Sequence, residues 1–240
     1  MLLDFEIKLL QLTRDRQRVM IEEFQNQLSQ YGFDLQETLA ALNAEGFLSF
    51  NDLFLEQTTL QRIMLAEHLI RRGRDPQLIS SLLLWQEFEE FIETALSRNA
   101  YHAVKRFIFK SRLGRREIDI LAWNEMWILA IDCKHWSRNL TKSRMRHVAA
   151  AQAQRARALA GRPELLEREG VTRLDLPMVP IILSLVDPRD QIVEGVPIVA
   201  VSKFASFLHE ISPYDASLKT FTIKREPAQS SLQLFREPKA

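Results

Sequence analysis

The pattern of hydrophobic residues changes at Asn99, and this change constrains the fold more than any other feature of the chain. Before it, apolar residues recur at the three- and four-residue spacing of helices, which predicts three or four helices over 1–72 and a long helix over about 76–98. After it, β-branched and aromatic residues come in short runs that are typical of strands. A helical N-terminal region is therefore expected to precede a domain built on a β-sheet.

The segments after Asn99 predict an α/β fold in which a mixed β-sheet is flanked by helices. Their order is three strands, a helix, two strands and a helix. The expected strands are 102–109, 117–122, 126–134, 179–186 and 196–201, with helices over 144–160 and 203–211 and one short strand near 221–223. We divide the chain into an N-terminal helical region (1–75), an α/β domain (76–212) and a C-terminal extension (213–240).

The composition excludes several other classes of protein. With 240 residues, 46% of them hydrophobic, the chain is long enough to bury a full core. A lone cysteine, Cys133, excludes an internal disulfide framework and fits a reducing compartment. The longest apolar run, near 179–186, is too short to cross a bilayer, and the first residues lack the layout of a signal peptide. A cytoplasmic protein with no membrane contact is expected.

The charge of the chain is unevenly distributed. The formal net charge is only +1, but the segment 98–162 holds 15 Lys and Arg against four acids, a net charge of +11. The remainder of the chain carries −10. A basic segment of this strength indicates a polyanionic partner, most often nucleic acid. The alternative is a basic solvated face that has no partner.

Two carboxylates on neighbouring predicted strands point to chemistry. Asp132 and Lys134 are two residues apart on one strand, so they share a face. If 123–126 form the turn of a hairpin, Asp119 faces Ala130 and lies diagonal to Asp132, roughly 7–8 Å away at the backbone. Two carboxylates across such a gap can hold one hard cation. A one-residue change in the turn would instead move Asp119 to the opposite face.

The predicted helix before these strands adds a third carboxylate. Glu89 lies on a stripe with Trp85, Ile92 and Leu96, so it borders the buried face of the helix. A carboxylate at an apolar seam needs a partner or a metal. The other acids of this helix are expected to face outwards: Glu87, Glu90 and Glu93.

In this order, Glu89, Asp119, Asp132 and Lys134 resemble the motif of the PD-(D/E)xK nuclease superfamily, which has a restriction-endonuclease-like fold. The resemblance covers roughly 82–211 and is greatest to uncharacterised archaeal-type members, although Ile118 stands where many members have Pro. It implies a Mg²⁺-dependent deoxyribonuclease, an endonuclease rather than an exonuclease, in which Mn²⁺ can substitute. DNA is the implied partner.

The resemblance also implies a role for each residue. Asp119, Asp132 and the backbone carbonyl of Cys133 would hold Mg²⁺, and Glu89 would bind a second ion or its water shell. Lys134 would orient or deprotonate the attacking water and offset negative charge in the transition state. The thiol of Cys133 should point into the core.

Gln152 is the one polar residue on an otherwise apolar stripe of the predicted helix 144–160. Many members of the superfamily have a Gln in the matching helix, which implies contact with the scissile phosphate or with Lys134. A simple hydrogen bond to the backbone is the alternative, and the sequence leaves both open.

The basic residues near the motif are the expected phosphate contacts. They are Arg115, Arg116, Lys142, Arg144 and Arg146.

Two alternative functions remain. One is a catalytically silent nucleic-acid-binding module of the same fold, and the other is a branched-DNA resolvase of the Holliday-junction type, which would act as a homodimer. The N-terminal helices carry no clear helix-turn-helix signature and could recognise DNA, mediate assembly or only pack on the nuclease.

Overall fold

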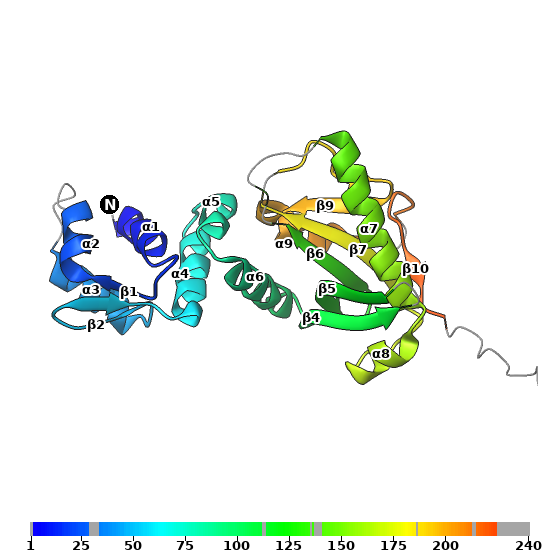
Figure 1. Cartoon of the computed structure of the whole chain (residues 1–240), viewed down its shortest axis with the longest axis horizontal. Coiled ribbons are helices and arrows are strands. Elements are labelled where there is room, and N and C mark those ends of the chain that lie inside the picture. Colours follow the sequence, from blue (N-terminus) through cyan, green and yellow to red (C-terminus); the bar gives the residue numbers. More distant parts are fainter. Residues whose placement is uncertain are drawn as a thin grey trace, which may run out of the picture.

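The computed structural model describes residues 2–28, 34–111, 114–134, 136, 141–185, 187–212 and 215–224. It confirms the predicted α/β class: a mixed seven-stranded sheet is flanked by helices, and a mostly helical region precedes it (Figure 1). The parts of the expected C-terminal extension at 213–214 and 225–240 lie outside the described residues.

The N-terminal region contains three short strands that the sequence did not predict, because two or three residues are too few for an alternating pattern. The strands pair antiparallel in the order β1-β3-β2. Together with the helices they form the N-terminal module, in the chain order helix, strand, two helices, two strands and helix. The elements are α1 (Leu2–Leu12), β1 (Arg18–Met20), α2 (Ile21–Leu28), α3 (Leu35–Ala44), β2 (Ser49–Phe50), β3 (Phe54–Glu56) and α4 (Thr59–Arg71).

The long helix expected before the sheet is two helices, α5 (Pro76–Ser81) and α6 (Trp85–Arg98). The chain turns between them because the side chain of Glu87 supplies a partner for the start of α6. The backbone N–H of Leu84 donates to Glu87 Oε2 at 2.8 Å, which satisfies one of the donors that a helix leaves free at its first turn.

Glu87 is buried, so the prediction that it faces outwards is wrong. Its carboxylate accepts from Arg62 Nε of α4 at 2.8 Å, and the Arg62 side chain is itself 1% exposed. The other guanidinium nitrogens of Arg62 donate to the backbone oxygens of Leu10 and Leu82 and to Thr13 Oγ1. This network of four hydrogen bonds ties α1 and α4 to the beginning of α6.

The large sheet has the strand order β4-β5-β6-β7-β9-β8, with β10 paired to β7. The first three strands are antiparallel neighbours, whereas β6, β7 and β9 run parallel. Its strands are β4 (His102–Ser111), β5 (Gly114–Trp123), β6 (Ile128–Lys134), β7 (Pro177–Ser184), β8 (Ile192–Val193), β9 (Val196–Ala200) and β10 (Phe221–Thr222). The helices around it are α7 (Lys142–Ala160), α8 (Pro163–Arg168) and α9 (Phe204–Glu210). Neither β8 nor α8 was predicted.

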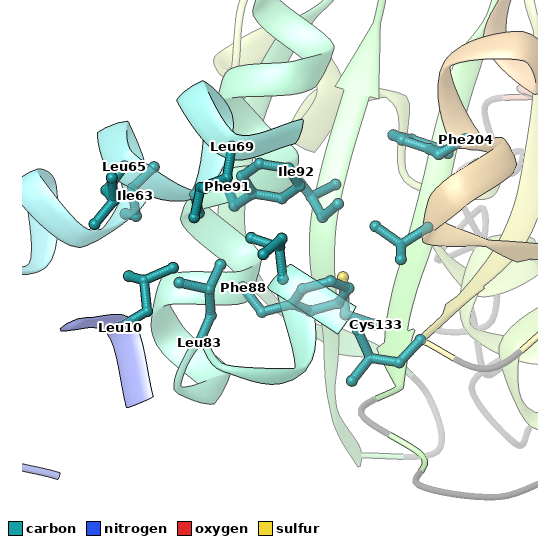
Figure 2. Packing of buried hydrophobic residues seen from close by; sticks show 14 of the residues in the cluster. Leu10, Ile63, Leu65, Leu69, Leu83, Phe88, Phe91, Ile92, Cys133 and Phe204 are labelled. Atoms are coloured by element: carbon teal, nitrogen blue, oxygen red, sulfur yellow. The ribbon is translucent and has the colours of Figure 1, made fainter. Parts of the chain in front are cut away.

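Helices cover both faces of the sheet. On one face, Phe88 of α6 and Phe204 of α9 pack in the same buried cluster as Cys133 of β6 (Figure 2). This confirms that Cys133 is a core residue. On the other face, α7 lies across the strands (Figure 1). Successive β6 residues alternate between the two faces, so Asp132 projects toward α7.

The first cluster also includes Leu10 of α1, so one hydrophobic core runs from the N-terminal region into the sheet. The predicted boundaries near 75 and 212 stay predictions. Among the described helices, none is both long and apolar enough to cross a membrane.

Candidate functional site

The pairing of β5 with β6 decides which carboxylates meet. Ile120 pairs with Ile131, so the register is shifted by two residues from the one that a turn at 123–126 would give. A shift of two leaves every side chain on its expected face. Continued along the strands, this register places Asp119 directly opposite Asp132 rather than diagonal to it.

The two strands separate at this point. The pairing of β5 with β6 ends at Ile120 and Ile131. The next N–H of β6 on the side of β5 is that of Cys133, and it donates to the Asp119 carboxylate oxygen Oδ2 at 2.8 Å. The N–H and C=O groups of a strand residue point to the same edge of the strand. The carbonyl oxygen of Cys133 therefore faces the gap that Asp119 occupies.

A backbone distortion lies on the other side of Asp119. Arg106 of β4 has φ 52, a left-handed conformation that is uncommon for a residue other than glycine. The register places it opposite Asp119. Lys105 contacts α6, whereas Phe107 packs with the cluster against α7 and α8, so the strand changes face at Arg106. No pattern in the sequence predicted this distortion, and backbone strain of this kind often marks a functional site.

Asp132 is 4% exposed and lies between two cationic groups. Its Oδ1 accepts from Arg155 Nη2 at 2.6 Å, and its Oδ2 lies 2.8 Å from Lys134 Nζ. The second contact is an ion pair without hydrogen-bond geometry, so Oδ2 has no hydrogen-bond partner among the described residues. The prediction that Asp132 and Lys134 share a face is confirmed.

The surroundings of Asp119 make its ionisation less favourable than that of a free carboxyl group. Burial, followed by the nearby charge of Asp132, raises the pKa of Asp119 to about 6, against the lowering effects of the Cys133 N–H and Lys134. Burial likewise raises the pKa of the Cys133 thiol well above its usual range, so this thiol is not a nucleophile.

Glu89 is buried near Asp119 and Asp132, but its carboxylate does not form a three-ligand metal cluster with theirs. Arg106 Nε lies 3.5 Å from Glu89 Oε2, and the charge of Glu89 contributes a small part of the raised pKa of Asp119. Within the described ranges, no three His, Cys, Asp or Glu side chains form a group that could hold a metal ion. The core of the candidate site is thus the pair Asp119 and Asp132.

Gln152 makes the backbone contact that the sequence left open. Its Nε2 donates to the carbonyl oxygen of Ala130 at 2.7 Å, and its Oε1 accepts from Arg155 Nε at 2.8 Å. Sequence reasoning missed Arg155, although it lies three residues after Gln152 and hence on the same side of α7. Its contact with Asp132 makes it part of the site.

The predicted phosphate contacts fall into two groups. Arg115 and Arg116 lie near the tip of the hairpin between β4 and β5, where Arg115 pairs with Lys110. Lys142, Arg144 and Arg146 are exposed on the first turns of α7.

Acidic residues border the second group. Lys142 and Arg146 line a hollow of about 300 Å³ together with Asp190 and Glu194. A wider groove of about 430 Å³ lies between β9 and α9, lined in part by Ile198 and Phe207, and contains none of the predicted site residues. The acids that compete for Lys142 and Arg146 therefore come from the segment around β8, because α7 itself contains no Asp or Glu.

Comparisons with known proteins give no activity. No family model matches the chain. An uncharacterised protein from Archaeoglobus fulgidus is 27% identical over 132 residues, which cover 52% of this chain and 92% of that protein. Two solved structures are similar: the protein of unknown function AF1548 (15% identity, 49% of this chain, TM-score 0.29) and protein VC1899 from Vibrio cholerae (11% identity, 87% of this chain, TM-score 0.37). This chain spans 51% and 49% of their respective lengths.

Proposed function

We propose that the chain is a metal-dependent nuclease that hydrolyses phosphodiester bonds in DNA, as an endonuclease. One observation carries this proposal. Where β5 and β6 separate, the carboxylates of Asp119 and Asp132 lie beside the backbone of Cys133, and Lys134 contacts Asp132. The strongly basic segment around them supplies a reason for the substrate to be a polyanion.

The residues at this gap fit a hard divalent cation. Asp132 Oδ2 is buried and makes an ion pair but no hydrogen bond among the described residues, and burial and the charge of Asp132 raise the pKa of Asp119. A cation between the two carboxylates would offset the repulsion between them and the cost of burying Asp119 in its ionised form. Asp119, Asp132 and the carbonyl of Cys133 would supply oxygen ligands, which suit Mg²⁺ and also Mn²⁺. Glu89 would act from further away, on the water shell or on a second ion.

The chemistry divides between the ion and the side chains. When bound, the ion lowers the pKa of a coordinated water and stabilises charge on the phosphate. Lys134 would orient the attacking water, whose proton leaves to solvent, and its ammonium group would offset the charge that develops on the phosphate oxygens. Asp119 has to be ionised to bind the ion, so its raised pKa should weaken metal binding as the pH falls through about 6.

A catalytically silent DNA-binding module is the second candidate, and one contact favours it. Both carboxylate oxygens of Asp132 already face a cation, Arg155 on one side and Lys134 on the other. A site that stays closed in this way would bind DNA through its basic surface without cutting it. A resolvase acting as a homodimer remains a third outcome.

The deciding experiment is a cleavage assay with linear, nicked, single-stranded and four-way branched DNA, in Mg²⁺, in Mn²⁺ and in EDTA. We expect metal-dependent cleavage by the wild type and none by Asp132→Ala. Binding without cleavage in either metal would favour the silent module, and cleavage restricted to the branched substrate would favour a resolvase.

A further inference from the structure

We propose that Arg155 is a phosphate-binding residue that holds Asp132 in the absence of metal and transfers to the DNA phosphate when a divalent cation binds. This inference rests on the proposed function and assigns a role to a residue outside the Asp119, Asp132 and Lys134 set. It also explains how Asp132 can bind a metal ion although Arg155 neutralises it when no metal is bound.

The contacts of Arg155 place it at the candidate site. Its Nη2 lies 2.6 Å from Asp132 Oδ1, the shortest separation at this carboxylate, and its side chain is 21% exposed. A guanidinium group with partial access to solvent can exchange one oxyanion for another, because carboxylate and phosphate oxygens suit the same planar donor geometry. Asp132, in contrast, is fixed on a buried strand.

Gln152 prepares Arg155 for this exchange. Its amide is fully buried and its Nε2 is committed to the carbonyl of Ala130, so its oxygen must face Arg155 Nε. This contact holds the guanidinium beside the site by Nε while Nη2 engages Asp132. The anion bonded by Nη2 can then change without loss of the contact to Gln152.

The balance of charges indicates when the exchange occurs. Three carboxylates, those of Glu89, Asp119 and Asp132, lie among three cationic groups, those of Arg106, Lys134 and Arg155. A divalent cation adds two positive charges to this cluster, so repulsion disfavours it while Arg155 stays on Asp132. A DNA phosphate supplies the anion that Arg155 can then bind. Metal and DNA should therefore each increase the affinity for the other.

The experiment measures Mn²⁺ affinity by electron paramagnetic resonance and DNA affinity by fluorescence anisotropy in Ca²⁺, with the full chain. Arg155→Met removes the competing charge from Asp132, so we expect Mn²⁺ to bind the free protein about 5- to 30-fold more tightly. The same variant loses the phosphate contact, so DNA affinity in Ca²⁺ should fall about 5-fold or more. Arg155→Lys keeps the charge and should move Mn²⁺ affinity by less than about 3-fold.

Arg157→Met is the matched control for the metal, because Arg157 is exposed on the same helix and its loss should leave Mn²⁺ affinity unchanged. Arg155→Gln is the second variant if Arg155→Met is unstable, since its amide can still bond Gln152. Unchanged or weaker Mn²⁺ binding in both neutral variants overturns the role of Arg155, while a wild type that binds Mn²⁺ and cuts DNA keeps the proposed function. A wild type that neither binds Mn²⁺ nor cuts DNA overturns both.

Discussion

Asp119 Oδ2 lies 2.8 Å from the backbone nitrogen of Cys133, and this contact stands where a strand-to-strand hydrogen bond would otherwise be. A side-chain oxygen thus takes the N–H that a β5 carbonyl would have accepted if the ladder continued. The strands can separate there without leaving that N–H unpaired. Asp119 therefore supports the backbone of the site as well as contributing a carboxylate to it.

Asp119→Asn should make folding less sensitive to pH. The pKa of Asp119 is about 6 in the folded chain and close to 3.8 when unfolded, so the folded state holds more protons between these values. Its contribution to stability is complete below pH 4 and is lost as the pH rises through 6. We expect the variant to gain about 1–2 kcal/mol over wild type at pH 7 and nothing at pH 4, the partial exposure of Asp119 reducing the full effect.

Urea unfolding in EDTA at pH 4, 5, 6, 7 and 8 measures this difference. The asparagine can still accept from the Cys133 N–H, whereas Asp119→Ala cannot and serves as the control. The alanine variant should lose about 1 kcal/mol relative to asparagine at every pH. A pH-independent gap between wild type and Asp119→Asn would contradict the raised pKa.

Asp132→Ala should separate binding from cleavage. The substitution removes a proposed metal ligand, so Mg²⁺-dependent cleavage should fall below detection. DNA affinity in EDTA should stay within about 3-fold of wild type or rise slightly, because Lys134 and Arg155 lose their acidic partner and the affinity comes from the basic segment. Cleavage at the wild-type rate would show that Asp132 is not a ligand.

Arg62→Met should destabilise the fold far more than a surface substitution. It leaves the Glu87 carboxylate buried without its partner, which typically costs about 3–5 kcal/mol. Arg62→Met with Glu87→Leu removes both charges and should recover a large part of that loss. Urea unfolding of both variants tests this, and equal stability of the single and double variants would mean that the pair does not interact.

Local patterns predicted most of the elements. Long or strongly apolar segments such as α7 and β6 were predicted within a few residues of their observed ends. The same patterns missed β8 and the strands of the N-terminal module, which are two or three residues long. They also missed the break before α6, because it depends on Glu87 and Arg62, and Arg62 reaches Glu87 only in the folded chain.

The candidate site was predictable in its motif and not in its neighbours. The predicted register of β5 and β6 was wrong by two residues. The prediction that Asp119 and Asp132 share a face still holds, because strand side chains return to the same face every two residues. Arg155 and Arg106 could not be assigned, because their partners lie 23 and 17 residues away in sequence and only the packing of α6 and α7 on the sheet brings them together.

The N-terminal module should contribute nothing to DNA affinity. From Ile21 to Glu56 it has seven acids and no Lys or Arg, and such a surface repels phosphates. The turn between β2 and β3 is also short, closed by Asn51 Oδ1 accepting from two backbone N–H groups. Glu37→Gln with Asp52→Asn should therefore leave DNA affinity within about 2-fold by anisotropy. A rise of about 10-fold would place DNA on this module.

The hairpin arginines should set the salt dependence of DNA binding. Each phosphate neutralised on duplex DNA contributes a slope of roughly 0.9 to the fall of log affinity with log salt, because bound counterions are released. Replacing Arg115 and Arg116 together with Gln should flatten the slope by about one to two units and weaken unrelated sequences equally, since phosphate contacts carry no base information. Lys142→Gln with Arg144→Gln should act in the same direction, whereas Glu37→Gln with Asp52→Asn leaves the slope unchanged. Affinity that does not vary between about 50 and 200 mM salt, or that the double arginine variant does not alter, would mean that these arginines only solvate the surface.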